Sequence, residues 1–440
     1  PSYHFNAAKT IVSVGADFLG TWLSPVEFSK QYSEARKVSA KKPEMAKHFQ
    51  FEALHTISGA AADVRATCKP SEYGAVVVAI HNALNGTNPS FASKKLNESI
   101  VSAATELKKG NGLVLCGVND VQIQTVVNAI NATIGANGTT IDWAVNSNYK
   151  QGIDSDFVNM VAAMNAGQVG VVMLHDVNPV YDYYQGNKFA EALKKVSTTI
   201  SFGERMDETT QLCKVIVPNH HFLESWGDAE PKTGYFSLMQ PGIAPIFKTR
   251  AFQDSLLLWS DATQSYGQYW NQYWITKLGG QENFDRILQE GVYKAGQTVP
   301  ASKNSSDSNI VATTITNMSG ASFIGDIATA ISSIQARKAM TGMEVIVYEK
   351  VSIGKGGAWS NNPWLQEMPD PITKATWDNY ACISPKKAKE LNEELTSITE
   401  VVAKKRVIKI TANGQEMTLP IVVMPGIHND VVAVAVGYGR

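Results

Sequence analysis

The chain has 440 residues and an almost balanced charge, with 39 basic and 40 acidic side chains. Hydrophobic residues make up 44% of it, which is typical of a folded chain with a large core and excludes a disordered polymer. The balanced charge gives no basis for binding nucleic acid, and no apolar run approaches the roughly 20 residues of a membrane-spanning helix.

Up to residue 218 the sequence alternates between strand and helix patterns. Short apolar runs predict strands at Ile11–Val14, Phe49–Leu54, Gly112–Cys116, Val169–Leu174, Thr198–Phe202 and Val215–Pro218. Longer segments predict helices at Pro25–Arg36, Ser71–Ala83, Ala92–Lys109, Val118–Ile134, Phe157–Ala166 and Phe189–Val196. The alternation predicts an α/β fold of parallel sheets covered by helices, with strands buried on both faces.

A different pattern begins near Lys303. The polar, serine-rich stretch Ser302–Asn309 predicts a linker, and a helix is expected at Ala321–Arg337. Further strands are predicted at Glu344–Val351, Val407–Thr411, Glu416–Val423 and Val431–Val436. Asn413-Gly414 favours a type I′ turn that would join two of them as a hairpin. We expect the start of a β-rich domain here, and we expect the chain to be a fragment of a longer polypeptide.

The first candidate site follows the strand Ile11–Val14, where Gly15, Asp17 and Gly20 lie in a loop. Ligands of open α/β sheets bind at the carboxyl ends of strands, and a helix amino terminus there can hold a phosphate. However, the glycine spacing is not GxGxxG and no Walker lysine follows. A tight turn is therefore the favoured interpretation, and nucleotide binding is the alternative.

The second candidate site follows the strand Val169–Leu174 and contains His175, Asp176 and Asn178. The proline after Asn178 favours an extended or turn geometry. Asp176 and Asn178 could bind the edge of a purine or pterin, but such residues more often hydrogen-bond the backbone of their own loop. His175 could be a ligand or a base, and a structural role is the commoner alternative.

The third candidate site is the polar and aromatic stretch that holds His220, His221, Glu224 and Asp228. Adjacent side chains of a strand point apart, so the two histidines cannot easily share a metal there. On a helix, His221 and Glu224 would lie on one face. No complete metal-ligand triad is present, and we favour a hydrogen-bonded network that lines a pocket.

The four cysteines, Cys68, Cys116, Cys213 and Cys382, include no CxxC pair. Iron–sulfur clusters and structural zinc usually need closely spaced cysteines. We therefore interpret these four as small buried hydrophobic residues.

The segment from Asn361 to Asn379 contains three prolines and two tryptophans. We expect it to wrap across a surface with its aromatic rings packed against another domain. Filling a cofactor cleft is the alternative role.

Taken together, these segments resemble the molybdopterin oxidoreductase superfamily. They are most similar to the molybdopterin-oxidoreductase-like region of the iron–sulfur subunit of bacterial alternative complex III, a quinol:cytochrome c oxidoreductase. The resemblance rests on the stretches GADFLGTWLSPVEFSKQYSEAR, MNAGQVGVVMLHDVNPVYDY, FGERMDETTQLCKVIVPNHHFLESWGDAEP, NNPWLQEMPDPITKATWDN and VVMPGIHNDVVAVAVGYGR.

The resemblance implies a domain division. Residues 1–66 would be the end of a first Rossmann-type α/β domain, and residues 67–300 a second α/β domain of the nucleotide-binding type. Residues 301–342 would be a linker and a helix, and residues 343–440 an incomplete β-rich, barrel-like domain.

The resemblance also implies a vestigial pterin cleft and no catalytic or metal-ligating residue. The cleft would be lined by Gly15, Asp17, Gly20, Asp176, Asn178, His220, His221, Glu224 and Asp228. Molybdopterin is expected to be absent, with iron–sulfur clusters in the remainder of the polypeptide.

The function that the resemblance implies is a scaffold in a respiratory quinol oxidoreductase. Expected partners are a multihaem cytochrome c and quinol-binding integral membrane subunits, at the periplasmic face of the inner membrane. Two alternatives are an active molybdopterin-dependent oxidoreductase of the polysulfide or tetrathionate reductase type and a free-standing nucleotide-binding protein.

Overall fold

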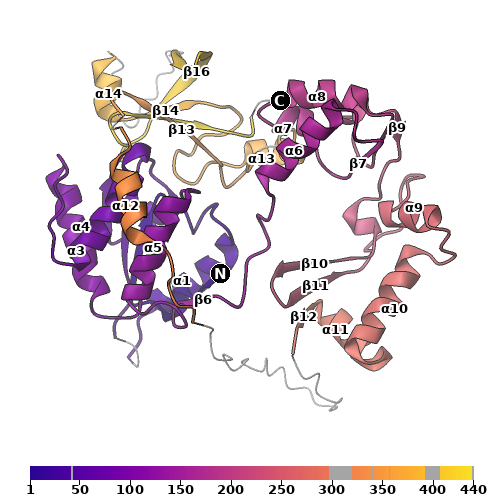
Figure 1. The fold of residues 1–440 in the computed structure, drawn as a ribbon, viewed down its shortest axis with the longest axis horizontal. Coiled ribbons are helices and arrows are strands. Elements are labelled where there is room, and N and C mark those ends of the chain that lie inside the picture. The colour runs from indigo at the N-terminus through magenta and orange to yellow at the C-terminus, as the bar shows by residue number, and fades with distance from the viewer. Residues whose placement is uncertain (41–42, 297–319, 339, 356, 392–406, 439–440) are drawn as a thin grey trace. The chain divides into compact units, whose positions relative to one another are not determined.

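The computed structural model describes residues 1–40, 43–296, 320–338, 340–355, 357–391 and 407–438. The chain divides into two compact units (Figure 1). Unit 1 consists of Pro1–Asn146 and Thr314–Arg440, and unit 2 is Ser147–Thr313. The linker expected at Ser302–Asn309 lies outside the described residues.

Unit 1 is built around a four-stranded sheet, here called the parallel sheet. Its order is β4 (Val64–Thr67), β3 (Lys47–Glu52), β2 (Thr10–Val14) and β5 (Gly112–Cys116), and all neighbours run parallel. The sheet joins strands on both sides of residue 66. The domain boundary expected there therefore lies inside one sheet, because β2 pairs with both β3 and β5.

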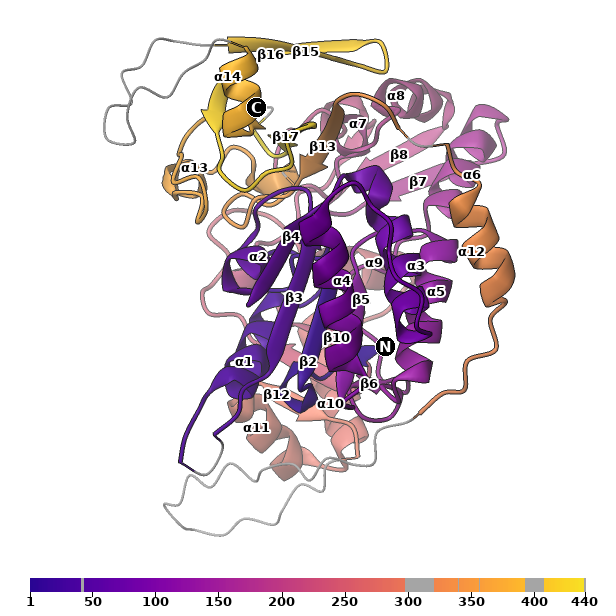
Figure 2. The ribbon, with the colours of Figure 1, turned by 90° about the vertical axis from the view of Figure 1, so that its left-hand side faces the viewer.

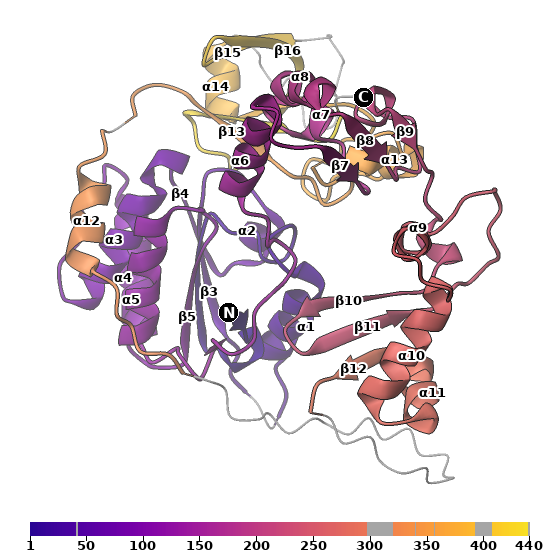
Figure 3. The same ribbon diagram turned by 45° about the vertical axis from the view of Figure 1, so that its right-hand side comes forward.

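Helices cover both faces of the parallel sheet, as Figures 2 and 3 show. One face packs against α3 (Tyr73–Leu84), α4 (Lys94–Leu107) and α5 (Val121–Thr133), and α12 (Ile327–Gln335) packs on α5 and α3. The other packs against α1 (Pro25–Arg36), and the short α2 (Ile57–Ala61) lies on that side. The alternation along β2 explains this, because Val12 faces the first core and Ile11 the second.

At the β5 edge of the parallel sheet, the side chain of Asn131 hydrogen-bonds the strand's backbone. β5 is an edge strand, and the fully buried Asn131 of α5 lies beside it. Its carboxamide accepts a hydrogen bond from Val114 N (3.0 Å) and donates one to Val114 O (2.8 Å). Asn131 thereby satisfies two backbone groups that a neighbouring strand would otherwise satisfy.

Unit 1 also contains a second sheet, here called the mixed sheet. Its order is β13 (Glu344–Tyr348), β17 (Val431–Ala435), β14 (Ala381–Ile383), β16 (Gln415–Val423) and β15 (Val407–Ala412). β15 and β16 form the predicted hairpin, with Asn413 and Gly414 at φ values of 49° and 76°. Two short helices, α13 (Pro363–Glu367) and α14 (Pro385–Glu390), lie between its strands in the sequence. A short β1 (Ser2–Tyr3) pairs with β6 (Ile141–Asp142) elsewhere in unit 1.

The first half of unit 2 is a small α/β layer. β7 (Val171–Leu174), β8 (Thr198–Ser201) and β9 (Val215–Ile216) form a parallel sheet. α6 (Asp154–Asn165) and α8 (Gly186–Lys195) pack against it, and α7 (Pro179–Asp182) follows β7. Both faces of β7 were expected to be buried. Instead Val171 and Met173 are about half exposed, because these helices cover one face within this unit.

The second half of unit 2 is an antiparallel sheet with three helices, none of which the sequence predicted. β10 (Gly227–Lys232), β11 (Tyr235–Met239) and β12 (Val292–Lys294) form the sheet (Figure 3). α10 (Tyr266–Leu278) and α11 (Gln281–Glu290) pack on it through the buried Trp270 and Trp274, and α9 (Phe252–Trp259) precedes them.

The edge contact of Asn131 can be tested by substitution. We expect Asn131→Leu to lower the free energy of unfolding of unit 1 by about 3 kcal/mol, because it leaves two buried backbone groups of Val114 unpaired. Denaturant titration measures this difference. Asn128→Leu, one turn earlier on the half-buried part of the same helix, is the matched control and should cost less than about 1 kcal/mol. Equal losses in the two variants would contradict the edge role.

Candidate functional site

The carboxyl ends of β2 and β5 are the first part of the candidate site. The strand order reverses between them, which is where open α/β sheets bind ligands. Gly15 has a φ of 62°, and a Cβ on it would lie 2.6 Å from Cε2 of Tyr73. A Cβ on Gly117 would lie 2.2 Å from the carbonyl oxygen of Gly15. Backbone and Tyr73 therefore fill the space directly beyond these two strands.

Asp17 organises the loop after β2. Its carbonyl oxygen accepts hydrogen bonds from the backbone of residues 20–22, and its Oδ1 accepts two from Ser58, from N at 2.9 Å and Oγ at 2.8 Å. A Cβ on Gly20 would lie 2.0 Å from the other carboxylate oxygen, so only glycine fits there. Burial raises the pKa of Asp17 and the charge of Glu52 adds to this, whereas the hydrogen bonds from Ser58 oppose it. Gly15, Asp17 and Gly20 thus shape a turn, as the favoured interpretation held.

A buried line of polar side chains runs along β3 toward this loop. His48, Gln50 and Glu52 occupy alternate positions and are at most 1% exposed. Tyr32 Oη lies 3.1 Å from His48 Nδ1, and His48 Nε2 lies 3.1 Å from Gln50 Oε1. Gln50 Nε2 donates to Glu52 Oε2 (3.1 Å) and to the carbonyl oxygen of Ala16 (3.2 Å). Because every member has a partner, this line, here called the β3 polar ladder, is stable in the core.

The β3 polar ladder ends in a buried ion pair. Glu52 Oε1 accepts from Arg65 Nε at 2.5 Å, and Glu52 Oε2 accepts from Thr56 Oγ1 at 2.6 Å. Arg65 also donates to the carbonyl oxygen of Gly426, which follows the mixed sheet strand β16 (2.7 Å). A Cβ on Gly59 would lie 1.9 Å from Glu52 Oε1, so the carboxylate needs a glycine beside it. The pair therefore links the parallel and mixed sheets of unit 1.

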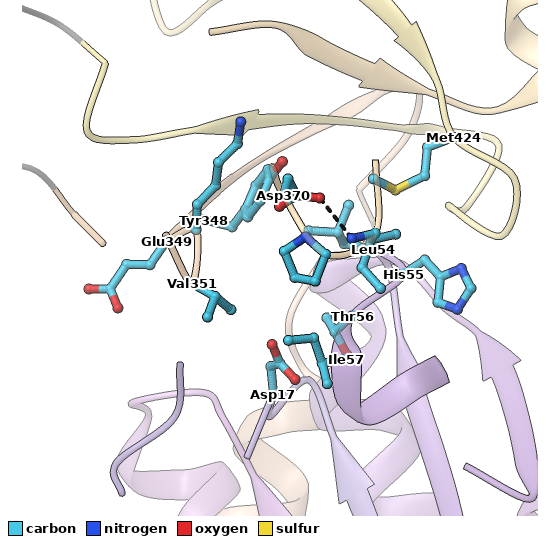
Figure 4. Close-up of a pocket in the computed structure, with 13 residues that line it drawn as sticks. Asp17, Leu54, His55, Thr56, Ile57, Tyr348, Glu349, Val351, Asp370 and Met424 are labelled. Carbon is cyan, nitrogen blue, oxygen red and sulfur yellow. Dashed lines mark hydrogen bonds between the residues drawn. The ribbon is translucent and has the colours of Figure 1, made fainter. Parts of the chain in front are cut away.

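A small cavity lies where these two sheets meet (Figure 4). Asp17 and residues 54–57 line it from the parallel sheet, and residues 348–351, 370–372 and Met424 line it from the mixed sheet. Its volume of about 30 Å³ suits a few water molecules. Pockets for drug-sized ligands measure roughly 300–1,000 Å³. Residues 370–372 belong to the proline-rich segment, which thus packs at the carboxyl edge of the parallel sheet beside Asp17.

In unit 2, Asn178 is held by the loop that follows β8. It is 8% exposed, its Nδ2 donates to Glu208 Oε2 (2.7 Å), and its Oδ1 accepts from Thr209 Oγ1 (2.6 Å). By contrast, Asp176 is exposed, with φ at 49°, and its Oδ2 lies 3.6 Å from His175 Nε2. Asn178 therefore has a structural role in its loop, whereas His175 and Asp176 lie at the surface after β7.

The stretch after β9 forms a local network. Glu224 accepts hydrogen bonds from the backbone N–H groups of Ile246 (2.9 Å) and His221 (3.0 Å), and both lower its pKa. His220 Nδ1 lies 2.6 Å from Thr249 Oγ1 and 4.0 Å from a Glu224 oxygen. A hydrogen-bonded network thus surrounds Glu224, within a 3₁₀ turn rather than on a helix face, and the pocket that it was expected to line stays a prediction.

Asp228 lies apart from that network, at the start of β10. Its Oδ2 accepts hydrogen bonds from both indoles of the core, Trp270 Nε1 at 2.7 Å and Trp274 Nε1 at 2.8 Å. The carboxylate thereby satisfies two indole N–H groups whose rings are almost fully buried. Its role within unit 2 is to anchor α10 on the antiparallel sheet.

The nine predicted cleft residues fall into two groups. Gly15, Asp17 and Gly20 lie in unit 1, where the structure brings them into one loop. The other six lie in unit 2, in three places: the loop after β7, the turn around Glu224, and the start of β10. The predicted cleft itself stays a prediction.

The sequence reasoning missed the β3 polar ladder. The signal was present, because Lys47–Glu52 alternates polar His48, Gln50 and Glu52 with Phe49 and Phe51. Such alternation normally indicates one solvated face. Here both faces of β3 are buried. Only the packing of α1 and of the loop after β2 shows that the polar side chains hydrogen-bond to one another.

All four cysteines are free thiols; Cys68, Cys116 and Cys382 are buried and Cys213 is partly buried. Within the described part of the chain, no three His, Cys, Asp or Glu side chains are grouped so that they could hold a metal ion. In that same part, no helix combines the length and apolar character needed to cross a membrane.

The fold that these units define is of the molybdopterin-oxidoreductase type, as the sequence predicted. Acetylene hydratase from Pelobacter acetylenicus superposes with a TM-score of 0.59 at 11% sequence identity, over 99% of this chain and 71% of that one. At this identity the likeness concerns the fold.

A relative in sequence is the menaquinone reductase molybdopterin-binding-like subunit of Nitratidesulfovibrio vulgaris (strain Hildenborough). The two are 30% identical over 105 residues, which is 23% of this chain and 15% of that protein. No protein-family model matches the sequence. The chain is thus related, over a limited stretch, to a subunit of a quinone reductase.

The ion pair at the end of the β3 polar ladder can be tested. We expect Glu52→Gln to lower the free energy of unfolding of unit 1 by about 3 kcal/mol, because it leaves the Arg65 charge buried and unpaired. Chemical denaturation measures the change. The control is Glu106→Gln, whose carboxylate pairs with the more exposed Lys47 (3.2 Å) and Lys109 (2.8 Å), and it should cost below about 1 kcal/mol. A loss no greater than that of the control would refute the role.

The ladder also predicts a pH dependence. Burial lowers the pKa of His48 to about 4, below the value of about 6.5 in an unfolded chain. Between these values the unfolded state binds the proton more tightly, so stability is lost as pH falls from about 6.5 to 4, by roughly 3 kcal/mol. Between pH 6.5 and 4 we expect the free energy of unfolding of the wild type to fall by roughly 3 kcal/mol more than that of His48→Gln. Parallel pH profiles of the unfolding free energy would argue against it.

Proposed function

We propose that this chain is a structural module of a membrane-associated respiratory quinol:electron-acceptor oxidoreductase of the alternative complex III type. In this proposal it carries no molybdopterin and performs no chemistry itself. The molybdopterin-oxidoreductase fold supports the proposal, as does the likeness to a subunit named molybdopterin-binding-like in a menaquinone reductase.

One observation carries the scaffold role. Three of the polar side chains in the predicted cleft are engaged by their own chain: Asp17 by Ser58, Asn178 by Glu208 and Thr209, and Asp228 by Trp270 and Trp274. A pterin dinucleotide needs free donors and acceptors at such positions. Binding a pterin through these three side chains would compete with hydrogen bonds that each contribute about 1 kcal/mol, which supports the proposal.

The remaining parts of the proposal concern the assembly. Iron–sulfur clusters would lie elsewhere in the polypeptide and pass electrons from quinol toward a cytochrome c or a similar acceptor. Integral membrane subunits and a multihaem cytochrome c would hold this module at the periplasmic face of the inner membrane.

A second candidate function is an active molybdopterin-dependent oxidoreductase. It is favoured by His175 and Asp176, which remain exposed after the carboxyl end of β7, the edge at which ligands bind in such sheets. In this alternative the two side chains would face the bound cofactor.

Metal analysis of the purified complex separates the two functions. The scaffold proposal predicts only traces of molybdenum and tungsten and no pterin fluorescence after oxidative extraction. It also predicts unchanged quinol oxidation in complex from cells grown with tungstate in place of molybdate. A molybdenum enzyme carried through the same extraction is the control. Stoichiometric molybdenum, or loss of activity on tungstate, would overturn the proposal.

A further inference from the structure

A group of buried polar atoms lies beyond the carboxyl ends of two neighbouring strands of the mixed sheet. β13 and β17 run parallel up to the pair Tyr348 and Ala435, and Val436 N still donates to the Tyr348 carbonyl oxygen. Lys350 and Ser352 follow β13, and Tyr438 follows β17. Adjacent carboxyl ends of parallel strands are where α/β proteins bind ligands. None of these three residues belongs to the predicted pterin cleft or to the proposed scaffold function.

Lys350 is the central member. Its side chain is 1% exposed, yet its Nζ has no hydrogen-bond partner among the residues that the structure describes. The amine lies 3.9 Å from the ring centroid of Tyr380 and 4.5 Å from that of Tyr438. Such cation–π contacts stabilise the amine when it is desolvated. The desolvation of an ammonium group costs several kcal/mol, so its N–H groups still require an acceptor.

Two nearby hydroxyl groups resemble the Lys350 amine in being buried and unpaired within the described residues. Ser352 Oγ and Tyr438 Oη are both buried, and neither has a hydrogen-bond partner within the described part of the chain. Burial raises the pKa of Tyr438, and the nearby Ser352 hydroxyl opposes that rise. The two hydroxyls are therefore neighbours, although they do not reach hydrogen-bond geometry. Three donors from two adjacent strand ends are thus left without an acceptor.

The charges that face Lys350 do not supply this acceptor. Asp370 and Asp378 both act on the amine electrostatically, as does the Cys382 thiol. Asp370 Oδ1 is already held by its own loop, through Ile372 N (3.0 Å), Thr373 N (2.6 Å) and Thr373 Oγ1 (3.0 Å). The hydroxyl of Tyr380 is likewise engaged, with Thr373 Oγ1 at 2.5 Å. Asp370 Oδ1 is thus engaged within its own loop, and the carboxylate acts on the Lys350 amine through its charge rather than through a hydrogen bond.

We propose that Lys350, Ser352 and Tyr438 form a binding site for one small oxyanion, the carboxylate, phosphate or sulfate group of a ligand. The ammonium group supplies the charge, the two hydroxyls supply further hydrogen bonds, and the rings of Tyr380 and Tyr438 hold the amine in place. Lys350 also lines the cavity of about 30 Å³ beside Asp17, whereas Ser352 and Tyr438 are not among the residues that line it.

Thermal unfolding of the full chain in inorganic phosphate tests this site, with sodium chloride at equal ionic strength as the reference. Phosphate stabilises most proteins by exclusion from their surface, without saturation. The site predicts an additional, saturable rise in Tm. Lys350→Met should weaken the apparent affinity at least about tenfold, a difference of 1.4 kcal/mol. Lys355→Met, a nearby exposed lysine, is the control and should keep the saturable rise.

The hydroxyl variants keep the test decisive if Lys350→Met does not fold. Ser352→Ala and Tyr438→Phe each remove one donor and should weaken phosphate binding while the lysine remains. A purely internal role of the amine predicts instead that Lys350→Met leaves the response to phosphate unchanged, because an apolar group can replace a buried ion without loss. Equal saturable responses in the wild type and Lys350→Met, or no saturable response in the wild type, would overturn the proposal. Sulfate and acetate then distinguish which oxyanion class binds.

Discussion

The buried carboxylate of Glu52 is the constraint on which much of unit 1 depends. A charge at 1% exposure is tolerated only when it is paired and hydrogen-bonded, and Arg65, Thr56 and Gln50 together meet that requirement. Arg65 in turn reaches the backbone of the mixed sheet at Gly426. One charged group therefore fixes the end of β3, the turn into α2 and the attachment of the second sheet.

In the loops where cofactor contacts were expected, polar side chains are likewise hydrogen-bonded within the protein. Asp17 accepts two hydrogen bonds from Ser58, and Asn178 is held by Glu208 and Thr209. In a ligand-binding α/β protein such groups at strand ends point toward the ligand. Here these groups bond to side chains of their own chain instead. Lys350 is the opposite case, because its buried amine has no acceptor in the described structure.

Sequence reasoning succeeded where apolar runs and turn residues act locally. Gly112–Cys116 was predicted with the bounds of β5, and Asn413-Gly414 forms the expected hairpin turn. It failed at β10, whose sequence Gly227–Lys232 contains a proline and three charged residues and has no strand-like alternation. That strand forms because β11 pairs with it and because Asp228 holds the tryptophans of α10. The contacts of Asp228 join residues more than forty positions apart and leave no local pattern.

The sequence by itself determined the class of fold, since alternating apolar and amphipathic segments can bury their apolar faces only as helices on parallel sheets. It also placed the candidate residues at strand ends. Only the tertiary structure decided what those residues do. Whether Asp17 or Asn178 is free for a ligand depends on partners distant in sequence, Ser58 and Thr209, that packing brings within hydrogen-bond distance. The same packing buried Lys350 between two tyrosines and left its amine unpaired, since a side chain's surroundings are set by the whole fold.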